Sequence, residues 1–212
     1  MAVAGRFITF EGGEGCGKST QIRLLADRLR SVGRDVLLTR EPGGTALAEK
    51  IRSLVREESD DPPGFRAETL LFLAARAQVV ENVIRPALAS GTWVLCDRFA
   101  DSTFAYQGYG RGLDLDELKR INSFATGGLE PDMTILLNVS PEVSAKRMRA
   151  REAATNTDAD RMEKAGDGFH TRLRQGFLEL AAAEPERFAV IQADGSVEEV
   201  EEAVWNSIQP ML

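Results

Sequence analysis

The sequence predicts one α/β domain, in which a five-stranded parallel sheet carries helices on both faces. Two observations support this prediction. Short apolar runs alternate with segments of helical periodicity along the 212 residues, and a glycine-rich loop follows the first apolar run. Parallel strands need crossover connections and are buried on both sides, so their sequences are short and apolar. No repeat or linker interrupts the pattern, and residues 1–212 are expected to form a single domain.

The first strand is expected over residues 7–10, and helical periodicity at 21–29 follows the glycine-rich loop. Two more helical patterns cover residues 46–55 and 65–89. The later strands are expected at four other short apolar runs, namely residues 36–39, 93–96, 134–139 and 188–191. Further helix starts are marked by capping residues: Ser140 with Pro141, Asp114 with Glu117, and Ser196 with Glu199.

Composition limits the possible partners. The formal net charge of -7 argues against a general nucleic-acid-binding surface, which is usually basic. The two cysteines, Cys16 and Cys96, are too few for a disulfide framework and match no zinc-ligand spacing. The sequence shows neither a signal peptide nor an apolar run of about 18 residues that could span a membrane. A cytoplasmic protein without membrane contact is expected.

The glycine-rich loop matches the phosphate-binding pattern G-x-x-x-x-G-K-[ST] at every fixed position between Gly12 and Ser19. Its backbone N–H groups should cradle phosphates, Lys18 should reach the β and γ phosphates, and Ser19 should face Mg²⁺. An ordinary glycine-rich turn would leave the Lys-Ser pair in register by chance. The pattern therefore predicts a P-loop NTPase fold, with ATP-binding residues Gly12, Gly13, Glu14, Gly15, Cys16, Gly17, Lys18, Ser19 and Thr20.

Asp97 and Arg98 directly follow the strand expected at residues 93–96. A carboxylate in this position can face the P-loop serine through Mg²⁺ or its waters. A lone Asp-Arg pair elsewhere would usually be a salt-bridged strand end. Beside a phosphate-binding loop, Ser19 and Asp97 are the expected metal ligands and Mg²⁺ the expected cofactor.

Phe72 and Arg76 lie four residues apart in the helical pattern and share one face of that helix. A nucleobase could stack on the ring while the guanidinium donates to its carbonyl oxygens. From spacing alone, a core phenylalanine and a solvated arginine explain the pair more simply.

Basic residues are concentrated at residues 146–151, before the polar stretch 152–160, and Arg161 follows it. A solvated helix face is the usual meaning of such a run. Next to a phosphate site, the stretch is instead expected to be a loop within a lid near residues 149–163, whose arginines neutralise the transferring phosphoryl group. The chain contains no Asn-Lys-x-Asp motif of GTPases, and no second strand-borne Asp-Glu pair typical of a motor ATPase.

Four motifs together resemble bacterial thymidylate kinases. They are Glu-Gly-Gly-Glu-Gly-Cys-Gly-Lys-Ser-Thr at residues 11–20, Thr-Arg-Glu-Pro-Gly-Gly-Thr at 39–45, Asp-Arg-Phe at 97–99 and Ser-Thr-Phe-Ala-Tyr-Gln-Gly at 102–108. The resemblance implies transfer of the γ-phosphoryl group of ATP to dTMP, giving dTDP and ADP, by a homodimeric cytoplasmic enzyme of dTTP synthesis. Another nucleotide kinase, or a P-loop regulatory protein that binds ATP to change shape, remains an alternative.

The resemblance also assigns roles to residues. Phe72 would stack on thymine, Arg76 would contact its carbonyl, and Thr103 and Gln107 would complete the base pocket. The phosphate of dTMP would be held by Arg52 and Arg98, the 3′-hydroxyl would meet Glu14, and the sugar and base side would be lined by Glu41 and Tyr106. A loop at residues 193–197 would contact adenine.

One branch of the family has an arginine at the position of Gly15, so here a lid arginine would assist catalysis. The expected catalytic residues are Lys18, Arg98, Arg149, Arg151 and Arg161; the last three are unranked candidates for the lid arginine.

Overall fold

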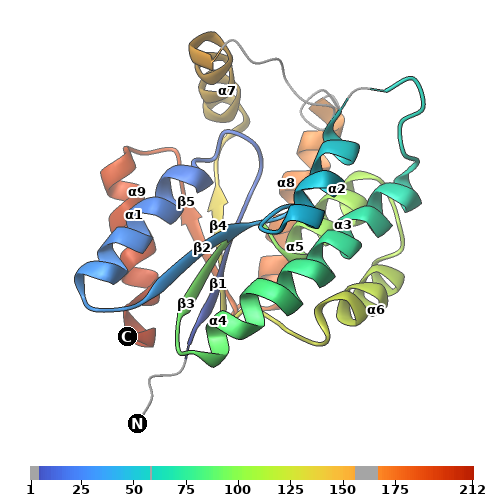
Figure 1. The fold of residues 1–212 in the computed structure, drawn as a ribbon. Coiled ribbons are helices and arrows are strands. Elements are labelled where there is room, and N and C mark those ends of the chain that lie inside the picture. Colours follow the sequence, from blue (N-terminus) through green and yellow to red (C-terminus); the bar gives the residue numbers. More distant parts are fainter. Residues whose placement is uncertain (1–4, 58, 156–166) are drawn as a thin grey trace.

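A computed structural model of the chain describes residues 5–57, 59–155 and 167–212 (Figure 1). Within these residues five strands form one parallel sheet in the order β2-β3-β1-β4-β5. The strands are β1 (Phe7–Glu11), β2 (Val36–Arg40), β3 (Trp93–Asp97), β4 (Met133–Asn138) and β5 (Phe188–Gln192). Each lies where an apolar run predicts it, so the expected five-stranded parallel sheet is confirmed.

The two faces of the sheet are covered by different helices. Alternate residues of β1, Ile8 and Phe10, pack with α1 (Lys18–Ser31) and α9 (Val197–Ile208) in one buried cluster. Phe7 points to the opposite face, where it packs with residues of the segments that follow β2 and β3. Figure 1 shows α1 and α9 on one side of the sheet and α3, α5, α6 and α8 on the other. The predicted cover on both faces is therefore present.

The remaining helices lie mainly on the second face. They are α2 (Ala46–Arg56), α3 (Phe65–Val79), α4 (Arg85–Ala89), α5 (Ala100–Thr103), α6 (Leu115–Thr126), α7 (Pro141–Thr155) and α8 (Asp167–Ala183). A short 3₁₀ turn, Gln209–Met211, follows α9. No helix among the described residues has the length and apolar character needed to cross a membrane.

Two π-helical segments interrupt these helices. The helix expected over residues 65–89 is continuous but contains η1 (Val80–Ile84) between α3 and α4. Pro86 follows closely, and a wider turn relieves its clash with the preceding turn. The second segment, η2 (Phe104–Gly110), continues α5. Gly110 is needed there, because a Cβ atom would lie 2.5 Å from the Phe169 ring.

The capping predictions are confirmed at two helices. Asp114 accepts a hydrogen bond from the Glu117 backbone N–H at 2.8 Å and begins α6. A full capping box of Ser196 and Glu199 begins α9. Pro141 is the first residue of α7, as predicted, although the contact from the Val143 N–H to the Ser140 hydroxyl is a long 3.5 Å.

The prediction of a loop over residues 152–160 is wrong for the first residues of that stretch. Helix α7 continues through Thr155, so residues 152–155 are helical. Glu152 and two alanines follow the basic run, and all are good helix formers, so they extend the helix. The rest of that stretch, residues 156–160, lies outside the described residues, as does Arg161.

Candidate active site

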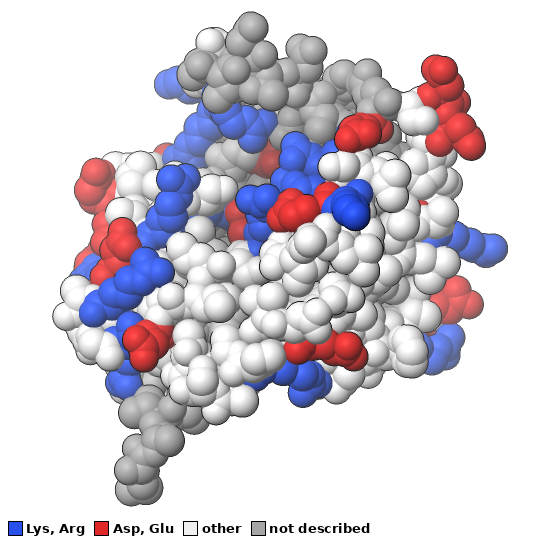
Figure 2. All heavy atoms as spheres, in the orientation of Figure 1, with Lys and Arg blue, Asp and Glu red and all other residues white. Residues whose placement is uncertain are grey.

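A cavity of about 490 Å³ opens at the carboxyl-terminal end of the sheet. It is walled by the P-loop, the ends of β2 and β3, helices α2, α3 and α7, and the α5–η2 helix. Ligands of open α/β sheets bind at this edge. Figure 2 shows Lys and Arg side chains gathered on this part of the molecular face, with a few carboxylates between them. The expected substrate residues Glu14, Glu41, Arg52, Phe72, Arg76, Arg98, Thr103, Tyr106 and Gln107 all line this cavity.

The P-loop wraps around the start of α1. Gly17 is the N-cap of this helix and has no side chain to bond the first N–H groups, which are left for an anion. Gly15 has φ of +69°, and a Cβ atom there would lie 2.8 Å from the Ser144 carbonyl oxygen of α7. An arginine at this position would therefore require a different backbone path.

Lys18 is folded back onto the loop. Its ammonium group donates to the carbonyl oxygens of Gly12 at 3.0 Å and Gly13 at 2.9 Å, and to the Cys16 sulfur at 3.4 Å. An ammonium group has three donors, so all three are used. A phosphate at the loop would have to replace at least one of these contacts.

Ser19 and Asp97 meet across the cavity floor, where the Ser19 hydroxyl donates to the Asp97 carboxylate at 3.2 Å. The described residues contain no group of three or more His, Cys, Asp or Glu side chains arranged to hold a metal. Mg²⁺ in phosphoryl-transfer sites commonly uses one or two protein oxygens together with phosphates and waters. The hydroxyl–carboxylate pair therefore fits Mg²⁺ bound with a nucleotide.

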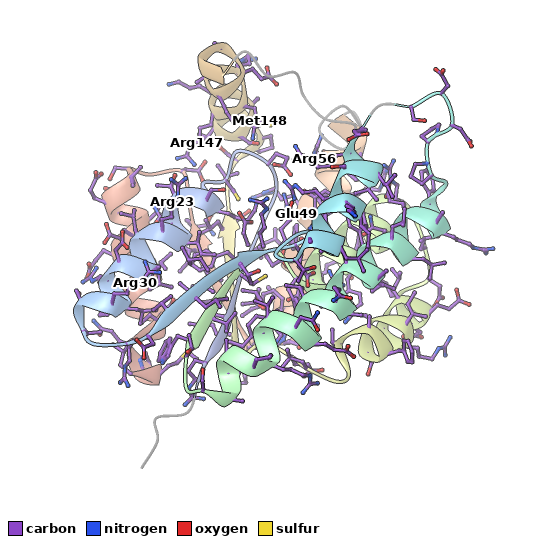
Figure 3. All side chains as sticks on the ribbon, viewed as in Figure 1. Arg23, Arg30, Glu49, Arg56, Arg147 and Met148 are labelled. Carbon is purple, nitrogen blue, oxygen red and sulfur yellow. The ribbon has the colours of Figure 1, made fainter. Side chains whose placement is uncertain are left out.

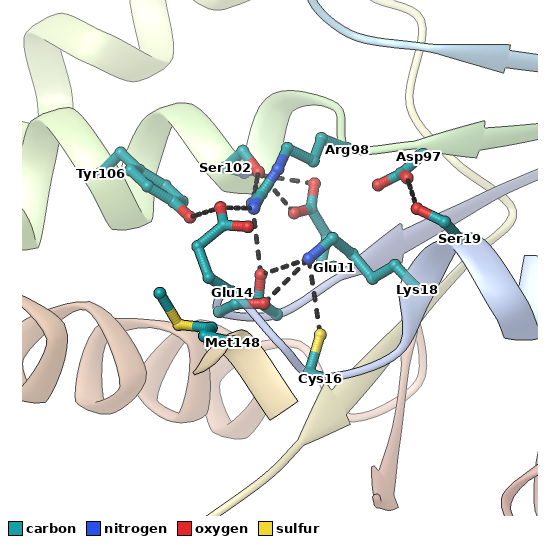
Figure 4. A network of polar contacts seen from close by, with 12 residues as sticks. Glu11, Glu14, Cys16, Lys18, Ser19, Asp97, Arg98, Ser102, Tyr106 and Met148 are labelled. Carbon is teal, nitrogen blue, oxygen red and sulfur yellow. Dashed lines mark hydrogen bonds and ion pairs between the residues drawn. The ribbon is translucent and has the colours of Figure 1, made fainter. Parts of the chain in front are cut away.

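Arg98 occupies the centre of the cavity wall in a left-handed backbone conformation, with φ of 70°. Its guanidinium is paired with the Glu14 carboxylate and also donates to the Gly12 carbonyl at 3.2 Å and the Ser102 hydroxyl at 3.3 Å (Figure 4). The Tyr106 hydroxyl donates to the same Glu14 oxygen at 3.1 Å. Burial opposes ionisation of Glu14, but Arg98 and Lys18 outweigh it and lower the pKa of Glu14 to about 2.

Arg76 is 3% exposed and is held by four groups from other elements. It donates to Glu41 at 2.7 Å, the Thr103 hydroxyl at 2.9 Å, the Asn122 amide oxygen at 2.7 Å and the Phe99 carbonyl at 2.9 Å. A guanidinium has five N–H donors, so these contacts leave one for a ligand.

Phe72 and Gln107 flank this buried network. Phe72 lies one helical turn before Arg76 and is half-buried in the cavity wall. The Gln107 amide donates to the buried Glu68 carboxylate at 3.0 Å, which fixes the direction in which the amide oxygen points. A flat ring and an oriented amide together suit recognition of a planar base.

Basic side chains lie on two sides of the cavity. Arg52 donates to the Pro42 carbonyl at 2.9 Å, and Arg56 lies near it on α2. From α7, Arg147 and Arg151 also line the cavity, and Figure 3 shows Arg147 on the opposite side from Arg56. Arg149 is exposed and is not among the lining residues.

Residues 10–204 match the family model described as thymidylate kinase. The chain belongs to the thymidylate kinase family. It is 52% identical over 206 residues to a thymidylate kinase from a Synechococcus strain, covering 97% of this chain and 95% of that protein. It is 47% identical over 212 residues to one from a Geobacter strain, covering 98% and 94%. The crystal structure of thymidylate kinase from Ehrlichia chaffeensis matches with a TM-score of 0.77 at 32% identity, covering 99% of this chain and 100% of that one.

Some residues that line the candidate site or support it from behind were missed by sequence reasoning. Arg147 was available in the basic run, and its guanidinium donates to the Gly195 carbonyl at 3.2 Å, within the loop expected to contact adenine. Glu11 and Glu68 carried a usable signal, because each is an acid within or beside a run of apolar residues. Asn122 carried none, since its partner Arg76 is 46 residues away.

Proposed function

We propose that this chain transfers the γ-phosphoryl group of ATP to dTMP and releases dTDP and ADP, as an enzyme of dTTP synthesis. One observation supports this most strongly. The P-loop and a second set of base-, sugar- and phosphate-directed side chains line the same cavity, so two nucleotides can meet in it. A protein that only changes shape with ATP has no use for the second set.

On the donor side, the P-loop backbone and Lys18 hold the β and γ phosphates at the start of α1. Residues 193–197 contact adenine in this proposal. Ser19 and Asp97 would hold Mg²⁺, which supplies positive charge against the phosphate oxygens.

On the acceptor side, Phe72 stacks on thymine, and the remaining N–H of Arg76 donates to a thymine carbonyl. The base pocket is completed by Thr103 and Gln107, and Glu41 lines it beside Arg76. The Glu14 carboxylate, held by Tyr106, accepts from the 3′-hydroxyl of the sugar. These side chains orient dTMP without reacting with it.

Arg52 and Arg98 hold the phosphate of dTMP, so an oxygen of this phosphate attacks the γ-phosphorus of ATP. That bond forms as the bond from the γ-phosphorus to the bridging oxygen breaks, and ADP leaves. No protein nucleophile takes part, and the rate depends on alignment and charge neutralisation.

Lys18 and Arg98 neutralise charge from the walls, and the segment near residues 149–163 acts as a lid that excludes water within this single domain of residues 1–212. The lid arginine is one of Arg149, Arg151 and Arg161. Arg151 has the strongest support, because it lines the cavity. Arg149 is exposed and does not line the cavity, and Arg161 lies outside the described residues.

A panel of acceptors tests the function directly. ADP release should require dTMP and should not be supported by AMP or CMP. Arg98→Ala should retain ATP binding and lose dTMP turnover. Nucleotide-dependent binding of a partner protein, with no acceptor consumed, would favour the regulatory alternative instead.

We also propose that the enzyme is a homodimer. This proposal is supported by exposed apolar side chains on three helices, of which α2 packs against α3 and α3 against α6. The side chains are those of Leu47, Leu54, Leu70, Ile121 and Phe124. Phe124 is 90% exposed. Sedimentation velocity of Phe124→Glu should show a shift from dimer towards monomer, whereas a monomeric parent protein would contradict the proposal.

A cytoplasmic location without nucleic-acid or membrane partners belongs to the same proposal. It is supported by two free, buried cysteines and a net charge of -7. Fractionation of cells that express the tagged protein tests it.

A further inference from the structure

Glu11 is a fully buried carboxylate that the proposed chemistry does not use. It is the last residue of β1, is 0% exposed, and is not among the residues that line the cavity. One oxygen accepts from the Phe99 N–H at 2.7 Å and the Ser102 N–H at 3.2 Å. The other accepts from the Ser102 hydroxyl at 2.6 Å. All three donors belong to the segment that begins the α5–η2 helix.

This arrangement caps α5 from a distant part of the chain. Phe99 is the N-cap residue of α5 and makes no side-chain cap of its own. The Glu11 carboxylate supplies the acceptor for the Phe99 N–H and for the Ser102 N–H in the first turn. A negative charge at a helix N-terminus is favourable. The strand that leads into the P-loop thus fixes the helix that carries Thr103, Tyr106 and Gln107.

Glu11 is also linked to Arg98 through one side chain. Ser102 donates to Glu11 and accepts from the Arg98 guanidinium at 3.3 Å, as Figure 4 shows. Arg98 has a positive φ, a conformation that is strained for a non-glycine residue. The surrounding bonds hold it, and the bond from the next residue, Phe99, to Glu11 is one of them.

Burying a carboxylate to accept these hydrogen bonds costs free energy, because the charged form loses its hydration. Burial, followed by the nearby charge of Asp101, raises the pKa of Glu11 to about 7, while Arg98 and the hydrogen bonds from Ser102 and Phe99 lower it. An uncharged side chain would avoid the burial penalty. Glu11 is therefore only partly ionised near neutral pH, and its charged form stabilises the Arg98 guanidinium.

We propose that Glu11 is a positioning residue of the acceptor site: it sets Arg98 and the α5–η2 helix relative to the P-loop, so that the two reacting phosphates are aligned. This inference rests on the proposed function, in which Arg98 holds the acceptor phosphate. Glu11 touches neither nucleotide. It acts through Ser102 and the backbone of Phe99.

Glu11→Gln tests the inference with the least disturbance. Glutamine keeps an oxygen for the two backbone N–H groups but replaces the oxygen that accepts from Ser102 by an amide group. We expect kcat/KM for dTMP to fall by about 10- to 100-fold, as for reacting groups displaced by about 1 Å. The Kd for ATP, measured by calorimetry, should stay within about twofold, because the P-loop contacts remain. Glu11→Ala, which loses every contact, should show the larger loss for dTMP.

Thr9→Val is the matched control. Thr9 lies two residues earlier on the same face of β1, is 0% exposed, and shares a hydrogen bond of 2.9 Å with the Thr134 hydroxyl. Its replacement should lower Tm and leave kcat/KM for dTMP unchanged.

Two results would overturn the inference: Glu11→Gln that loses only Tm, as the control does, or equal losses for ATP and dTMP. If Glu11→Ala does not fold, Glu11→Gln still decides the question. A parent protein without dTMP-dependent ADP release would instead overturn the proposed function, so the two failures are distinguishable.

Discussion

Replacing Arg76 by leucine should separate the structural role of this buried arginine from its proposed contact with the base. Arg76 and Glu41 are 3% and 5% exposed, with their charged groups 2.7 Å apart. Breaking a buried ion pair by removing one partner costs about 3–5 kcal/mol, because the other charge stays buried. Leucine also leaves Thr103, Asn122 and the Phe99 carbonyl without a donor, so the upper part of that range is expected.

A double-mutant cycle shows how much of the free-energy cost of Arg76→Leu comes from the unpaired charge of Glu41. Glu41→Gln replaces the stranded charge by a neutral amide, so Arg76→Leu should cost about 2 kcal/mol less in that background. Arg85→Leu is the matched control, because Arg85 is exposed and, within the described part of the chain, donates to the Thr126 and Gly127 carbonyls alone. It should cost no more than about 1 kcal/mol.

The pH dependence has a definite sign. Burial raises the pKa of Glu41, and Arg76 opposes the increase through its charge and hydrogen bond. Without Arg76, the pKa of Glu41 rises further. A carboxyl whose pKa is raised in the folded state loses stability as pH rises above the unfolded value of 4.5. The deficit of Arg76→Leu should therefore be larger at pH 8 than at pH 5, and Glu41→Gln should remove the difference.

Urea unfolding followed by circular dichroism measures these free energies by linear extrapolation. A cost of Arg76→Leu below about 1 kcal/mol would refute the reasoning, since it would mean that Glu41 finds compensation elsewhere. Additive effects of the two substitutions would refute the coupling.

Other predictions concern single residues of the cavity. Phe72→Ala should raise KM for dTMP by the equivalent of about 1–3 kcal/mol while KM for ATP changes little, and an effect on Tm alone would return Phe72 to a packing role. Lys18→Ala should abolish detectable ATP binding in calorimetry, and retained binding would contradict its contact with phosphate. The Glu14 pKa of about 2 contributes stability above pH 4.5 that is lost as pH falls towards 2, so Glu14→Gln should flatten acid unfolding monitored by fluorescence over that interval. Asp101→Asn should lower Tm with little change in kcat, because Asp101 pairs bidentately with Arg187 away from the cavity.

Local patterns predicted most of the fold. Each strand was visible as a short apolar run. The central strands β1, β3 and β4 are buried on both faces, which favours such runs. The edge strands β2 and β5 are also mostly apolar, although they are partly exposed. The P-loop and the helix caps depend on residues within three to seven positions of one another. The π-helical segments were not predicted, since they depend on how a helix meets Pro86 and on the packing of Gly110 against Phe169.

In the candidate site too, local spacing predicted some neighbours, whereas contacts between residues distant in sequence were not predicted. Phe72 and Arg76 could be paired from spacing, because they share one helix. The partners of Arg76 could not, since Glu41, Phe99, Thr103 and Asn122 come from segments 23 to 46 residues away. A resemblance to relatives supplied some of these residues as contacts of substrate, but not as contacts of one another.

Strand order explains why these distant residues meet. The order β2-β3-β1 pairs Arg40 with Asp97, and Asp97 with Phe10. Neighbouring strands lie about 5 Å apart, so the residues that follow these three paired positions must be neighbours too. They are Glu41, Arg98 and Glu11, and Glu11 is still the last residue of β1. The acceptor side of the cavity is thus built from three successive strand ends, and a change in strand order would separate it even if every local motif were kept.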